Sequence, residues 1–87
     1  MPNIESAAKR ARQDRIRRVR NRGAKSAIVT QRRVFLKAIE SNDKTLALKL
    51  FKEFCSLLDK TAKRGIITKN TADRRKSRAS HMLAKMT

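Results

Sequence analysis

The chain has 87 residues, enough for one compact domain with a single modest core and too few for two. It carries 24 Lys and Arg residues against 7 Asp and Glu, a net charge of +17. Mutual repulsion on that scale opposes compaction unless a polyanion or counterions screen it, so a nucleic acid is the expected partner. With two Gly, one Pro and no alternating β-branched run, the composition predicts an all-α protein.

The first predicted helix is long. Pro2 and Asn3 are typical of a helix start, and from residue 4 to Glu40 only Gly23 interrupts good helix formers. Such a helix is about 55 Å long at 1.5 Å per residue. After Gly23 its apolar residues form a stripe that can face a bundle. The stripe consists of Ala24, Ala27, Ile28, Val34, Phe35, Ala38 and Ile39.

Before Gly23 the same helix has no apolar stripe, because basic residues point in nearly every direction around it. These residues are Lys9, Arg10, Arg12, Arg15, Arg17, Arg18, Arg20 and Arg22. A helix charged all round cannot pack on its own domain. We therefore predict one domain over residues 1–87, in which residues 1–22 form a projecting basic helical arm and residues 23–87 form a three-helix bundle.

A second helix is predicted from about Lys44 to Arg64, after a turn in which Asn42 or Asp43 caps it. Its apolar sector is about 200° wide once Leu48 and Cys55 at one edge are included. One partner helix cannot cover that sector, so this helix should pack against two. The other expected core positions are Leu46, Ala47, Leu50, Phe51, Phe54, Leu57, Leu58 and Ala62.

Gly65 provides a C-terminal stop for the second helix, and Ile66 and Ile67 can fold back onto the core. Either Thr68 or Asn70 can cap a third helix that reaches about Met86. The apolar side of this helix consists of Ala72, Ala79, Met82, Leu83 and Met86, with Arg74, Arg78 and Lys85 opposite.

The sequence offers nothing that resembles an active site. His81 has no partner at a triad-like or metal-like spacing, and no glycine-rich phosphate loop, paired carboxylate set or zinc motif occurs. The lone cysteine, Cys55, excludes an internal disulfide, indicates a reducing compartment and is expected to be a small core residue. We therefore predict a protein that is not an enzyme and has no cofactor and no metal.

All three Phe residues are assigned to the core, so no exposed ring remains for stacking on unpaired bases. Recognition of folded RNA by its phosphates and 2′-hydroxyls remains, with Arg as a bidentate fork. An arm charged on every side suits insertion between RNA segments better than docking on one surface. Asn3, Ser6, Asn21 and Ser26 are candidate short-range donors.

Three other interpretations of the basic helix compete with this one. A solvated tail does not explain why charge surrounds the helix. A basic-zipper DNA-binding protein needs several leucine heptads, whereas the stripe after Gly23 ends at residues 41–43, so the chain folds back instead of dimerising. A membrane-active helix needs a continuous apolar face, which Ala11, Ile16 and Val19 do not provide.

Two segments resemble a known family. Residues 1–10 resemble the start of bacterial small-subunit ribosomal protein twenty, and residues 63–78 are similar to its C-terminal signature, in which a glycine, two aliphatic residues and lysine-asparagine precede a basic helix. The likeness spans essentially the whole chain. It departs from the family at Arg64, where Ala is common, at Thr68, where His is common, and at Asp73, where a small residue is common.

This resemblance implies a three-helix bundle that binds 16S ribosomal RNA directly, early in assembly of the small ribosomal subunit. It implies contacts with the 5′ domain and the long penultimate helix, and a place on the ribosome in the cytoplasm. No membrane, small-molecule substrate or homo-oligomer is expected. Carried over by position, the RNA-contacting arm corresponds to residues 3–25 and ends at Lys25. The second contact region corresponds to Lys69, Asn70, Arg74, Arg75, Lys76, Ser77 and Arg78.

Overall fold

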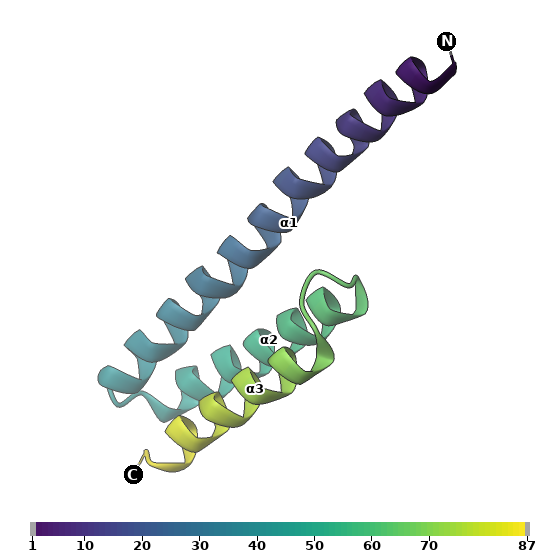
Figure 1. The fold of residues 1–87 in the computed structure, drawn as a ribbon. Coiled ribbons are helices and arrows are strands. Elements are labelled where there is room, and N and C mark those ends of the chain that lie inside the picture. Colours follow the sequence, from purple (N-terminus) through teal and green to yellow (C-terminus); the bar gives the residue numbers. More distant parts are fainter. Residues whose placement is uncertain (1, 87) are drawn as a thin grey trace.

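The computed structural model describes residues 2–86, and it describes side chains for residues 5–86. The described chain forms three α-helices joined by two short connections. Helix α1 spans Pro2–Glu40, α2 spans Lys44–Lys63 and α3 spans Lys69–Ala84. Figure 1 shows α2 and α3 as an antiparallel pair beside the C-terminal half of α1, while the N-terminal half extends beyond them. The molecule is therefore elongated, at 67 × 21 × 13 Å. The predicted all-α bundle with a long projecting first helix is confirmed.

Helix α2 holds the bundle together, because it packs closely against both α1 and α3 while those two approach each other much less. Phe35 of α1 packs against Phe51 and Phe54 of α2, with ring centroids 6.1 and 6.4 Å apart. The prediction that α2 packs against two helices is confirmed. The buried core consists of Ile28, Phe35, Ala38, Ala47, Leu50, Phe54, Leu58, Ala72, Ala79 and Met86.

A tight turn after α1 reverses the chain. Asn42 adopts a left-handed conformation (φ 57°) in which its amide bonds the Ile39 carbonyl and the Asp43 amide bonds the Ala38 carbonyl. These two bonds form the motif that commonly ends helices at a left-handed residue. Of the two predicted caps, Asp43 is the one used, because its Oδ1 accepts from the Leu46 amide at 3.1 Å.

The same motif ends α2, with Gly65 in the left-handed position (φ 78°). The Gly65 amide bonds the Ala62 carbonyl, and the Ile66 amide bonds the Thr61 carbonyl. Thr68 then caps α3, since its hydroxyl accepts from the Thr71 amide at 3.1 Å. Sequence reasoning left Thr68 and Asn70 open as caps, and the geometry selects Thr68.

Several expected core positions are wrong. Leu46 and Leu48 are 43% and 44% exposed, because two helices cover the middle of the wide apolar sector of α2 and leave both its edges open. On α1, Val34 is 42% exposed and Ala27 is exposed too. Since α1 packs mainly against one partner, it buries a narrower stripe than its sequence allows.

Candidate nucleic-acid interface

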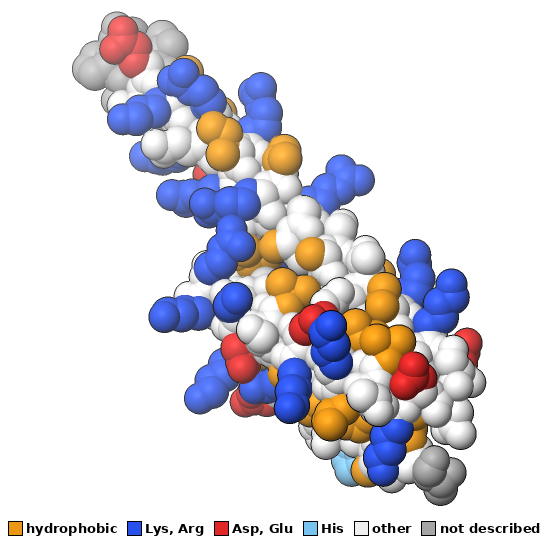
Figure 2. Space-filling view, turned by 180° about the vertical axis from the view of Figure 1, so that it is seen from behind, with side chains coloured by type: hydrophobic (Ala, Val, Ile, Leu, Met, Phe, Trp, Pro, Cys, Tyr) orange, Lys and Arg blue, Asp and Glu red, His pale blue; other side chains and the backbone are white. Residues whose placement is uncertain are grey.

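The projecting half of α1 is a solvent-exposed basic surface. Every residue from 5 to 20 is exposed, and Gly23 does not interrupt the helix. In Figure 2 Lys and Arg side chains stand out along this half, with few acidic side chains among them, whereas the bundle half of the same view shows more Asp and Glu and larger apolar areas. Of the predicted contact residues, Asn21 is half-buried at the start of the bundle, and the side chain of Asn3 lies outside the described residues. The predicted residues that are exposed here are Ser6, Lys9, Arg10, Arg12, Arg15, Arg17, Arg18, Arg20, Arg22, Lys25 and Ser26.

The exposed cations of the arm do not all lie together. One hollow on the side of α1 is lined by Arg15, Arg18, Arg22 and Lys25, with Asn21, Ser26 and Val19 between them. The other basic residues of the arm, among them Arg17 and Arg20, are not part of its lining and point elsewhere around the helix. The arm thus offers one concentrated cationic hollow and further cations on its remaining sides.

The second predicted region, on α3, is divided between two sides of that helix. Arg74, Arg75 and Arg78 line a groove between α1 and α3, whose opposite wall includes Arg32 of α1. Lys69 and Lys76 line a different hollow, between α2 and α3, together with Asp59 and Asp73. Asn70 and Ser77 are exposed on α3. Sequence reasoning missed Arg32, because no local signal shows which residues of α1 face α3 across the bundle.

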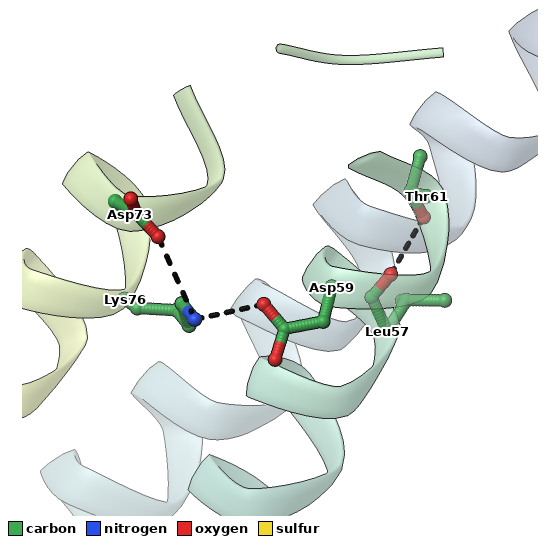
Figure 3. A network of polar contacts seen from close by, with 5 residues as sticks. All are labelled: Leu57, Asp59, Thr61, Asp73 and Lys76. Atoms are coloured by element: carbon green, nitrogen blue, oxygen red, sulfur yellow. Dashed lines mark hydrogen bonds and ion pairs between the residues drawn. The ribbon is translucent and has the colours of Figure 1, made fainter. Parts of the chain in front are cut away.

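Lys76 is held by carboxylates rather than left free. Its Nζ lies 2.7 Å from Asp59 Oδ1 on α2 and 3.7 Å from Asp73 Oδ1 on its own helix, as Figure 3 shows. The hydrogen bond to Asp59 raises the pKa of Lys76 above its usual value, with the charge of Asp73 adding to the effect. Lys76 therefore ties α3 to α2, and its charge is partly compensated within the chain.

The interior holds few polar groups. The Thr61 hydroxyl, buried in α2, donates to the Leu57 carbonyl at 2.6 Å (Figure 3). Cys55 is half-buried, and this burial raises the pKa of its thiol against the opposing charge of Lys76. Among the described residues, no buried side-chain nitrogen or oxygen lacks a partner, and no cluster of His, Cys, Asp and Glu could hold a metal ion. Nor is any helix of the described range long and apolar enough to span a bilayer.

Together, the bundle and its surface define a class: small, basic, all-helical proteins with a projecting helix that carries cations on all sides. The family model described as Ribosomal protein S20 matches residues 2–84. The chain belongs to the ribosomal protein S20 family. It is therefore a ribosomal protein, found with the ribosome in the cytoplasm, and not an enzyme.

Curated relatives agree with the family match over most of the chain. Each of the following is a small ribosomal subunit protein bS20. The protein of Brachyspira hyodysenteriae is 48% identical over 77 residues, 88% of each chain. Those of Nitrosococcus oceani and Akkermansia muciniphila are 42% and 41% identical, over 99% of both chains in each case. The family is thus one of structural components of the small ribosomal subunit, and the likeness spans nearly the full length of its members.

Proposed function

We propose that this chain binds 16S ribosomal RNA directly and helps it fold by neutralising phosphates where RNA segments converge. Its place would be in the small subunit, between the 5′ domain and the long penultimate helix, as family resemblance implies. The contact residues would be the predicted residues of the arm, from Asn3 to Ser26, and on α3 Lys69, Asn70, Arg74, Arg75, Lys76, Ser77 and Arg78.

One observation carries this proposal: the first half of α1 stays helical while packing against nothing in its own chain. Residues 5–20 are all exposed, and the cations among them face every direction. An isolated helix in water is marginal even when its propensity is good, and repulsion between like charges weakens it further. Phosphates on several sides supply the counter-charge that such a helix needs.

Arginine suits this role for a geometric reason. Its planar guanidinium bonds a phosphate through two parallel N–H groups, and it stays charged at any physiological pH. When arginines of one arm bind phosphates of several RNA segments, they hold together segments that would otherwise repel one another. This biases the RNA toward its compact fold.

The test is a titration of the protein against 16S ribosomal RNA and against random duplex DNA of similar length, at several salt concentrations. We expect saturable one-to-one binding to the RNA that persists at physiological salt, with affinity falling as salt rises. Equal affinity for the RNA and the DNA, lost together as salt rises, would identify a generic polycation and overturn the proposal.

A further inference from the structure

Three neighbouring hollows on the surface are linked by lining residues that they share. The hollow on the arm and the one beneath the α2–α3 connection share Lys25. The latter shares Arg75 with the groove between α1 and α3. A path through the linked hollows therefore begins at Arg15, passes Lys25 and Arg75, and ends in the groove beside Arg78. From Arg15 to Arg32 it follows α1 for about 25 Å, at 1.5 Å per residue. We call this path the basic track.

The basic track has charges of one sign only. None of the described side chains that line its three hollows is acidic. The hollows elsewhere differ: the one between α1 and α2 includes Glu53 beside Lys52 and Lys60, and the one between α2 and α3 includes Asp59 and Asp73. The cations of the track are Arg15, Arg18, Arg22, Lys25, Arg32, Arg74, Arg75 and Arg78.

The floor of the track is apolar where the bundle forms it. Ile66 and Ile67, both half-buried, line the middle hollow, and the half-buried Leu36 and Met82 line the groove, whereas Ile28 and Phe35 beneath them are only 1% exposed. Arginines stand on both walls of that groove, Arg32 on α1 and Arg74 and Arg78 on α3. A groove that combines cations with apolar surface suits a nucleic-acid strand, because a strand presents phosphates together with the less polar faces of its sugars and bases.

We propose that the basic track holds one continuous RNA strand, which runs from the arm past Arg75 into the groove between α1 and α3. This proposal rests on the proposed binding to 16S ribosomal RNA and deepens it. The arm and the arginines in the middle of α3 then act as two ends of one strand site and not as separate contacts with unrelated RNA segments. Cations on the other sides of the arm, such as Arg17 and Arg20, remain for neighbouring segments.

Site-directed cross-linking to 16S ribosomal RNA tests this directly. In a Cys55→Ala background, Ser26→Cys places a photoactivatable group in the arm hollow beside Lys25, and Met82→Cys places one in the groove between α1 and α3. Ser56→Cys, on the exposed side of α2, is the off-track control. Circular dichroism first verifies that each variant is as helical as the parent. Primer extension then maps the nucleotides that each group reaches.

We expect the Ser26→Cys and Met82→Cys cross-links to fall on one strand. Their separation should be no more than about 16 nucleotides, the upper site size of single-strand grooves. The control should reach a different segment or none. Cross-links on two distant segments, with RNA binding intact, would overturn the track and leave the proposed function standing. Failure of the parent chain to bind 16S ribosomal RNA would overturn both.

A matched pair of neighbours tests the groove by affinity. Arg32 lines the groove, whereas the adjacent Arg33 is exposed but not part of the track. Replacing each by Met keeps most of the apolar stem and removes the charge. We expect Arg32→Met to weaken binding to 16S ribosomal RNA by about tenfold or more, and Arg33→Met by about twofold or less. Equal effects of the two substitutions would overturn the role given to the groove.

Discussion

The two halves of α1 share one uninterrupted backbone and have opposite surroundings. Residues 5–20 are all exposed and carry cations on every side. Residues 24–40 have a buried face, in which Ile28 and Phe35 are each 1% exposed. The change from exposed to partly buried surroundings occurs beside Gly23, where an added Cβ atom would have no neighbour within 4 Å.

This difference separates two sources of helix stability. The bundle half is held by burial of its apolar face, which contributes about 25 cal/mol for each Å² removed from water. The arm has no such burial, so in the free protein its helix depends on intrinsic propensity and on the bundle half, which spares it a nucleation step. Changes in the arm should therefore alter RNA binding, and changes in the buried core of the bundle should alter folding.

Charge reversal in the arm should give the largest effect. The variant Arg15→Glu/Arg18→Glu/Arg22→Glu removes three cations from one hollow. If each makes a charge-assisted hydrogen bond worth about 1.5–3 kcal/mol, affinity for 16S ribosomal RNA falls by about a thousandfold or more. Filter binding measures this loss, and circular dichroism should show nearly unchanged helix content. Unfolding in parallel with the loss of binding would show that the arm belongs to the core.

Removal of a core ring should have the opposite result. Phe54 is 1% exposed and stacks on Phe35, so Phe54→Ala should cost about 3–5 kcal/mol of unfolding free energy. The total free energy of unfolding of a natural protein is only about 5–15 kcal/mol. Leu46→Ala is the control, expected to cost about 1 kcal/mol because Leu46 is 43% exposed. Urea denaturation measures both, and similar costs would contradict the assigned core.

The two glycines should respond to alanine with opposite signs. Gly65 has φ 78°, which disfavours an L side chain, so Gly65→Ala should destabilise the bundle by about 1 kcal/mol. Gly23 lies inside a helix with open space around it, so Gly23→Ala should stabilise α1 by about 0.5–1 kcal/mol. Thermal melts report the first change. Slower amide exchange on the arm side of residue 23 reports the second, and faster exchange there would contradict it.

The smallest effect concerns the thiol of Cys55. Because burial raises its pKa, the thiolate forms at a higher pH in the folded chain than in the unfolded one. Alkylation by iodoacetamide should therefore reach half its maximal rate at a higher pH than in urea. Folding disfavours the thiolate, so the free energy of unfolding should decline slightly as the pH rises above the usual thiol pKa of about 8.5. The same dependence of the alkylation rate on pH with and without urea would contradict the partly buried environment assigned to Cys55.

Local patterns in the sequence were enough to predict the three helices, the turn after Glu40, the stop at Gly65 and the exposed charge of the arm. Helix formation, capping and amphipathicity depend on residues within a few positions of one another, so they can be recognised without the fold. Charge all round a helix likewise excludes burial wherever that helix lies.

Tertiary structure decided what depends on the positions of the helices relative to one another. Leu46 and Val34 are exposed although both lie on the apolar side of their helices. Leu46 is exposed because the two partners of α2 do not cover its whole apolar sector, and Val34 because α1 has only one main partner. Tertiary structure also paired Lys76 with Asp59, seventeen residues away, and placed Arg32 opposite the arginines of α3. No local signal carries these relations, since they arise only when α2 brings α1 and α3 to its two sides.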